Sequence, residues 1–199
     1  MVCVGARVEL LVLAAEPHAC VGVDVDTGAF VRARYPAGAF ADLAPLDLAR
    51  AEVATPSEPP DSARPELVDL VDAPRRSGRA RGQRAERLLR PLLHPRGRPL
   101  LGSVGAAVAF WTLTGDHPSI ALVEPEQAAV VLPTAAGYEC HFLWRGLHHV
   151  LPLADRRLVR ALDRSGRPRY RALRRRRLIV ALSPPVNGYC YKVVAGLLP

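Results

Sequence analysis

The residue types best suited to binding chemistry gather near the end of the sequence, in Tyr189-Cys190-Tyr191-Lys192. Alternate side chains of an extended strand point to opposite faces, so Tyr189 and Tyr191 share one face and Lys192 takes the other. Exposed aromatic rings can stack on nucleic-acid bases, each stack contributing ~1–3 kcal/mol. Lys192 is the only Lys beside 26 Arg, which suggests that a compact ammonium group is required there. The alternative is that both Tyr pack in a core and that Lys192 is a solvated charge at a sheet edge.

A second candidate is a basic stretch that ends in four consecutive arginines. It holds one aromatic residue, Tyr170, together with Arg164, Arg167, Arg169, Arg171, Arg174, Arg175, Arg176 and Arg177. Such a density of guanidinium groups suits phosphate, with an affinity that falls as the salt concentration rises. The alternative is a solvated connection between strands. Charge alone does not predict readout of a base sequence.

Acidic residues and histidines are weaker candidates, for catalysis or metal binding. Asp24 and Asp26 lie two apart, but a turn explains Asp26 without any chemistry. Cys140-His141 and His148-His149 imitate a metal site across a hairpin, although adjacent strand residues face opposite ways and at most one of each pair can ligate. The chain carries none of the common nucleotide-binding, hydrolase or metalloprotease motifs. We therefore predict no catalytic residue, no metal and no cofactor, and we do not expect an enzyme.

Composition and charge point to a folded chain with a basic second half. Of the 199 residues, 49% are hydrophobic, and 19 Pro and 15 Gly favour many turns and short elements. The net charge of +8 divides into −4 for residues 1–60, +5 for 61–100 and +7 for 101–199. Basic charge favours a phosphate-rich partner, whereas an excess of Arg is also typical of GC-rich genomes. Four well-separated Cys without metal-ligand spacing, and no apolar run near the ~20 residues of a membrane helix, favour a cytoplasmic location with no membrane contact.

Apolar runs with a period of two predict a succession of short strands. One hairpin turns at Asp26-Thr27-Gly28, a second at Arg145-Gly146-Leu147, and Asn187-Gly188 is a further turn signal. The apolar start of the chain is interpreted as a strand rather than a signal peptide, because Glu9 interrupts it. The expected strands are 7–14, 21–25, 30–35, 46–53, 104–113, 119–123, 128–132, 138–144, 148–153, 178–182 and 189–198.

The remaining segments are expected to be connections, apart from one short helix. Residues 85–93 have an amphipathic pattern with four Leu on one face. Residues 54–66 and 74–84 are expected to be loops, the second of them basic. Trp111 and Trp144 lie in expected strands and are predicted to fill the barrels.

Each half of the chain thus shows a strand, a hairpin, an interrupting connection and further strands. This order suits a small Greek-key barrel such as an OB-fold. We predict a mostly-β protein of two small OB-like barrels with a short helix and long polar connections. The first covers residues 1–125, including a Pro/Arg-rich insert at about 54–100, and the second covers 126–199, including an Arg-rich insert at about 155–177.

Four segments resemble the dual OB-containing domain family, bacterial proteins with two OB-type barrels. They are Cys20–Arg32 (CVGVDVDTGAFVR), Leu46-Asp47, 138–155, and 178–195 (LIVALSPPVNGYCYKVVA), of which the last is the most specific. Pro184 stands where the family usually carries Gly-Glu, so an acid of the family pattern is missing. The resemblance implies the two-barrel fold and binding of nucleic acid or a nucleotide, and it implies no catalytic residue.

The residues and the resemblance together predict a non-catalytic binding module for single-stranded nucleic acid or a nucleotide. We expect the ligand to contact residues 156–177 and the Tyr189–Lys192 strand. An alternative is an adaptor that binds a separately encoded enzyme, which the long Pro/Arg-rich centre favours. The third hypothesis is a hydrolase or nuclease that uses Asp24, Asp26 or a His cluster.

Overall fold

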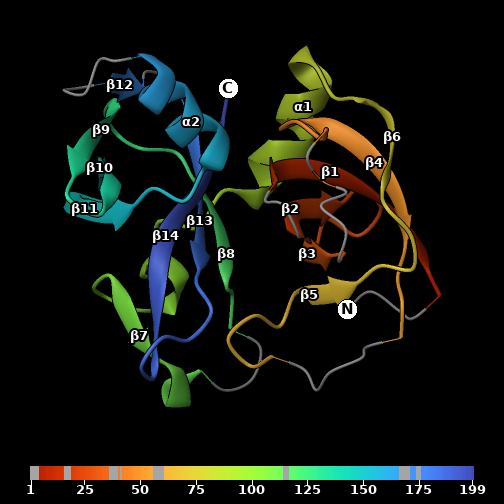
Figure 1. Ribbon diagram of the computed structural model, residues 1–199, viewed down its shortest axis with the longest axis horizontal. Helices are drawn as coiled ribbons and strands as arrows, with labels where there is room; N and C mark the ends of the chain where they lie inside the picture. The colour runs from red at the N-terminus through yellow and green to blue at the C-terminus, as the bar shows by residue number, and fades with distance from the viewer. Residues whose placement is uncertain are drawn as a thin grey trace. The chain divides into compact units, whose positions relative to one another are not determined.

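The computed structural model describes residues 5–15, 19–35, 40, 42–55, 61–113, 117–165, 171–173 and 176–199 (Figure 1). Contacts divide the chain into two compact units, Met1–Leu92 and Leu93–Pro199. Each unit is built around its own curled sheets, and the protein is mostly β, as predicted.

The first unit is a barrel that closes through a short parallel strand. Its strands are β1 (Arg7–Ala15), β2 (Ala19–Asp24), β3 (Phe30–Arg34), β4 (Asp47–Glu52), β5 (Leu67–Asp69) and β6 (Arg75–Arg79). The sheet has the order β5-β3-β2-β1-β4-β6, with β5 parallel to β3. A bridge between Val53 and Leu70 joins the end of β5 to the end of β4. The closed order β1-β2-β3-β5-β4 is that of an OB-type barrel.

The interior of this barrel follows from the alternation that the sequence shows. Val8, Leu10 and Val12 of β1 enter the core, and Phe40, between β3 and β4, is fully buried with them. Arg34 on β3 donates from Nε and Nη2 to the Asp69 carboxylate on β5, at 2.6 and 3.1 Å. This bidentate ion pair stabilises the parallel pairing of β5 with β3.

The second unit repeats the plan with additional strands. Its elements are β7 (Ala107–Ala109), β8 (Ile120–Val123), β9 (Ala129–Thr134), β10 (Gly137–Trp144), β11 (Leu147–Pro152), α2 (Arg156–Ser165), β12 (Arg171–Leu173), β13 (Arg177–Leu182) and β14 (Tyr189–Leu198), with short 3-10 turns η2 (Leu100–Gly102) and η3 (Phe110–Thr112). The sheets have the orders β11-β10-β9-β12 and β7-β14-β13-β8. A parallel bridge between Leu153 and Val194 connects β11 to β14. The connected order β9-β10-β11-β14-β13 again follows that of an OB-type barrel, and β12 pairs with the other side of β9.

Three expectations for the connections are corrected. Residues 75–79, expected to be loop, form β6, because β4 offers them an open edge. The helix of the first unit, α1, spans Gly82–Leu89 and is followed by a 3-10 turn, η1 (Arg90–Leu92), since Pro91 lacks the N–H that would continue the helix. The insert predicted at about 155–177 contains the helix α2, capped by Asp155, whose Oδ1 accepts N–H bonds from Arg157 and Leu158 at 3.0 Å each.

The division between the units also differs from the boundary placed at residue 125. β8 pairs with β13, and β7 pairs with β14, so residues 107–123 add strands to the sheets of the second unit. Pro125 marks a break between two strands of the same unit. Composition cannot reveal which sheet a strand joins, because pairing is decided by partners far away in the sequence.

Gly22 allows a prediction about the first barrel. A Cβ at this position would lie 2.9 Å from the Leu11 carbonyl oxygen, a backbone atom of the neighbouring strand. Gly22→Ala should therefore lower the free energy of unfolding by about 1–3 kcal/mol, measured by urea denaturation. Gly78→Ala is the matched control, because its nearest neighbour is Leu48 Cδ1 at 3.8 Å. Equal stability of the two variants would contradict the argument.

Candidate nucleic-acid interface

The Tyr189–Lys192 segment forms the start of β14 and alternates as predicted. Tyr189 and Tyr191 are 42% and 40% exposed, whereas Lys192 is fully buried. The alternative with the Tyr pair in a core and Lys192 at a solvated edge is therefore wrong on both counts. The barrel interior lies on the Cys190 and Lys192 side of the strand.

Trp111 joins the two tyrosines on the surface, which corrects the expectation that it fills a barrel. The strand β7 ends at Ala109, and the 3-10 turn η3 carries Trp111 outward to 65% exposure. Its ring lies 5.5 Å from that of Tyr189, at 65° between the planes. Trp144, by contrast, is 2% exposed and fills the second barrel as predicted. We call Trp111, Tyr189 and Tyr191 the aromatic surface. The largely apolar segment 104–113 holds no sequence signal that distinguishes Trp111 from a core residue.

The turn between β13 and β14 supports this surface. Asn187 and Gly188 have φ of 51° and 80°, the left-handed pair that a two-residue hairpin turn requires. The Gly188 carbonyl accepts the N–H of Phe110 at 2.8 Å, which joins the turn to η3. A Cβ on Gly188 would lie 2.9 Å from Trp111 Cζ3. Only glycine leaves room for the indole ring in this position.

Lys192 lies beneath the aromatic surface and anchors the segment that leads to Trp111. Its backbone N–H donates to the Ala106 carbonyl at 2.8 Å, and its Nζ donates to the Ser103 carbonyl at 2.7 Å. Burial lowers the pKa of Lys192 to about 8. The single Lys of the chain thus has a structural position under the surface and does not contact a ligand from solvent.

Two half-buried histidines lie near Lys192. The ring of His149 stacks on Phe142, with the centroids 5.1 Å apart, and its Nε2 has no hydrogen-bond partner among the described residues. His94 packs edge-on against Trp144 at 5.3 Å. Burial lowers the pKa of both histidines, and the charge of Lys192 acts in the same direction. Both imidazoles are therefore expected to be neutral, which limits repulsion inside the barrel.

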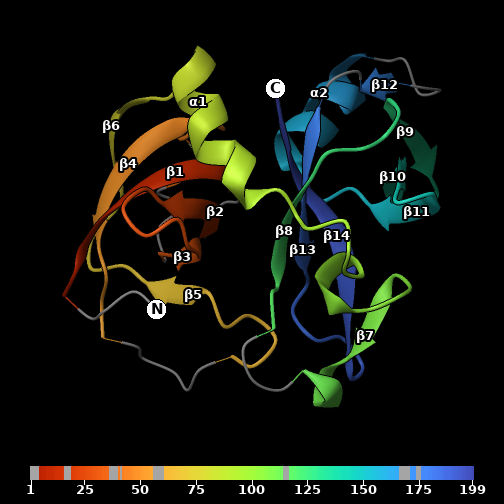
Figure 2. The same ribbon diagram turned by 180° about the vertical axis from the view of Figure 1, so that it is seen from behind.

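Those of the predicted basic residues that the structure describes lie at the other end of the same ribbon. Arg177 pairs with Leu198, nine residues along β14 from Tyr189, which corresponds to a distance of roughly 30 Å. Figures 1 and 2 both show α2 and β12 at one end of β14 and β7 at the other. The structure thus does not bring the two predicted halves of the site together.

The end near α2 is nevertheless strongly basic. Exposed guanidinium groups belong to Arg156, Arg160 and Arg164 of α2 and to Arg176 before β13. We call these four residues the basic end. Arg177 is different, because its side chain is 12% exposed and its Nε lies 3.8 Å from Glu124 Oε1. Tyr170, Arg174 and Arg175, together with the side chain of Arg171, lie outside the part of the chain that the structure describes.

The acidic and histidine candidates have structural partners. Asp24 Oδ1 accepts the N–H of Asp26 at 3.2 Å, and Oδ2 accepts the Thr27 hydroxyl at 2.7 Å, so the pair shapes the β2–β3 turn. His141 and His148 face each other on the outer side of β10 and β11, with ring centroids 5.5 Å apart. Within the described residues, no group of three or more His, Cys, Asp or Glu side chains has a metal-binding arrangement.

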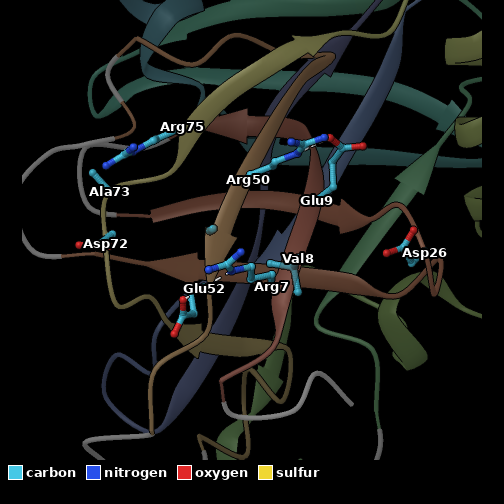
Figure 3. A pocket seen from close by; sticks show the side chains of 10 residues that line it. Arg7, Val8, Glu9, Asp26, Arg50, Glu52, Asp72, Ala73 and Arg75 are labelled. Carbon is cyan, nitrogen blue, oxygen red and sulfur yellow. Dashed lines mark hydrogen bonds and ion pairs between the residues drawn. The ribbon is translucent and has the colours of Figure 1, made fainter.

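A hollow of about 630 Å³ lies on the first unit (Figure 3). Its lining includes three Arg and four acidic residues. The Nε atoms of Arg50 and Arg7 lie 3.3 and 3.9 Å from carboxylate oxygens of Glu9 and Glu52, respectively. Because these charges neutralise one another, the hollow offers no excess positive potential to a phosphate group.

The fold defines the class of protein, one made of two OB-type barrels. The chain belongs to the dual OB-containing domain family, whose sequence profile matches residues 16–197. No curated protein and no solved structure matches it. Among the described helices, none is both long and apolar enough to cross a membrane.

Proposed function

We propose that this protein binds single-stranded nucleic acid, with bases stacked on the aromatic surface, and that it performs no chemistry of its own. The observation that carries the proposal is the exposure of Trp111, Tyr189 and Tyr191 together at one end of an OB-type barrel. Every base has a flat face, so stacking tolerates any sequence. Free nucleotides share the same chemistry and differ only in lacking a backbone beyond the stacked base.

The distribution of charge supports a ligand that continues beyond the aromatic surface. The second unit contains fourteen Arg and one Lys against six acidic residues, a net charge of +9, whereas the first unit has a net charge of −1. A single nucleic-acid strand that extends from the aromatic surface to the basic end must cover the roughly 30 Å along β14. At about 3.4 Å per stacked nucleotide this requires about nine nucleotides. The resulting footprint falls within the ~4–16 nucleotides of OB-type sites.

The test is a length series of labelled single-stranded DNA and RNA, from about four to about sixteen nucleotides, titrated at several salt concentrations. We expect affinity to rise with length until both ends of β14 are covered and then to level off. We also expect the salt dependence to increase with length, as more phosphates meet arginines. A mononucleotide that binds as well as the long oligonucleotides would favour a nucleotide site. Absence of binding to every oligonucleotide at low salt would overturn the proposal.

One observation favours the adaptor alternative. No Arg or Lys side chain is exposed among the described residues of 103–113 and 183–191, and Val104 and Val186 there are 79% and 52% exposed. An uncharged apolar surface also suits a protein partner. Co-purification of one stoichiometric protein, lost in Trp111→Ala, with no oligonucleotide binding would support this function. A monomer without bound protein in the native host's lysate would contradict it.

A further inference from the structure

A second surface with the properties of a phosphate-binding site lies on the first unit, far from the aromatic surface in the sequence. Residues 75–90 contain seven Arg and one Glu, a net charge of +6. The other residues of that unit contain five Arg and twelve acidic residues, a net charge of −7. Codon composition would distribute Arg without regard to position. Segregation of charge into sixteen consecutive residues therefore indicates a specific use.

These arginines follow one continuous path along β6 and α1. All of them are exposed: Arg75, Arg76, Arg79, Arg81, Arg84, Arg87 and Arg90. Figures 1 and 2 show β6 at the side of the first barrel leading directly into α1. The strand and the helix together extend the path over roughly 25 Å. We call these seven residues the arginine ridge.

The ridge divides into an anchored part and an unpaired part. Asp47, almost completely buried, lies 3.3 Å from Arg76 Nη2 and 2.9 Å from Arg79 Nη1, so these two arginines hold β6 against β4. The structure shows no acidic partner for Arg81, Arg84, Arg87 or Arg90 among the residues that it describes. Four exposed guanidinium groups therefore remain available for an external anion.

Two of the unpaired arginines, Arg81 and Arg84, do not contribute to the stability of α1. Arg81 is the N-cap residue and makes no side-chain capping bond, and the first turn contains no acidic residue. Acidic side chains are favoured at this end of a helix, so Arg81 and Arg84 lie where a cation costs stability. A local preference that is violated without a stabilising contact is typical of a binding surface.

The chemistry of the ridge favours a nucleic-acid backbone over a membrane surface. Guanidinium groups donate paired hydrogen bonds to phosphate oxygens, which a phosphodiester chain presents at regular intervals. A helix that binds a membrane also needs an exposed apolar face. On α1 the apolar residues Ala85 and Leu89 are buried and Leu88 is partly buried. We propose that the arginine ridge binds the phosphodiester backbone of nucleic acid, independently of the base sequence and of the aromatic surface.

The test compares the full-length wild type with two triple variants of equal charge. The ridge variant is Arg81→Gln/Arg84→Gln/Arg87→Gln. The control is Arg7→Gln/Arg50→Gln/Arg98→Gln, whose three arginines are also exposed. Binding is measured with single-stranded and double-stranded oligonucleotides over a salt series, and with vesicles rich in phosphatidylserine. Thermal unfolding is followed by circular dichroism, and the ridge variant should be about as stable as the wild type, because removal of the unfavourable charges of Arg81 and Arg84 offsets the loss of the favourable charge of Arg87 in the last turn.

We expect the ridge variant to bind both kinds of oligonucleotide about tenfold more weakly or worse, and the slope of log K against log salt to fall by about 2 for single strands. The control should retain wild-type slope. Equal losses in both variants would overturn the inference, and so would a loss confined to vesicle binding. Alanine replacement of the aromatic surface separates this inference from the proposed function, since it should weaken single-strand binding alone and leave double-strand binding through the ridge intact.

Discussion

Trp111→Ala combined with Tyr189→Ala should lower the affinity for single-stranded oligonucleotides by at least about 30-fold, because each base stacked on an aromatic ring contributes ~1–3 kcal/mol. Trp111 and Tyr189 are 65% and 42% exposed and their rings contact each other, so their loss removes a stacking platform without opening a core. The measurement is fluorescence anisotropy of a labelled oligonucleotide of about twelve nucleotides, within the usual size of an OB-type site.

Two controls separate stacking from charge and from general loss of apolar surface. Tyr189→Phe keeps the ring and should bind like the wild type. Leu147→Ala removes an apolar side chain that is 54% exposed on the same unit but outside the aromatic surface, and it should also bind normally. The salt dependence of the double variant should equal that of the wild type, because no cation is removed. An altered salt dependence with unchanged affinity at low salt would contradict stacking.

The largest expected pH effect on stability comes from Lys192. Its pKa in the folded protein is lowered by burial to about 8 from the ordinary value of 10.5. Below pH 8 the group is protonated in both states, and the full cost of burying the charge is present. As pH rises from about 8 to 10.5, the unfolded chain keeps a proton that the folded chain has released, so stability increases. The gain is roughly 3 kcal/mol in total.

Cys140 changes the pH dependence of stability in the opposite direction, so its effect must be distinguished from that of Lys192. Burial raises the pKa of its thiol to about 12 from 9.0, so stability falls above pH 9 as the unfolded chain forms the thiolate. The measurement is therefore the difference between the wild type and Lys192→Met in urea denaturation at several pH values from 7 to 10.5. The contribution of Cys140 cancels in this difference. The free energy of unfolding of the wild type should increase relative to that of the variant as pH rises above 8. A difference in unfolding free energy that stays constant with pH would contradict a buried ammonium group.

Local sequence signals determined the β-hairpins and the alternation of side chains. Asp26-Thr27-Gly28, Arg145-Gly146-Leu147 and Asn187-Gly188 mark turns that the structure contains, since φ > 0 or a hydrogen-bonding side chain specifies a turn within four residues. The opposite directions of Tyr189 and Lys192 followed from the period of a strand alone. The mostly-β class and the two OB-type barrels followed from the spacing of these signals and from the family resemblance.

The tertiary structure alone decided which face of each strand lies inside and which segments meet. Alternation distinguishes two faces of β14 but not the buried one, and closure of the second barrel placed Lys192 inside and Tyr189 outside. Trp111 is exposed because β7 ends before it, and residues 75–79 form a strand because β4 has a free edge. The separation of the aromatic surface from the basic end depends on the pairing of β13 with β14. Such pairings join residues distant in the sequence, and no local pattern encodes them, because their free energy arises only when the barrel closes.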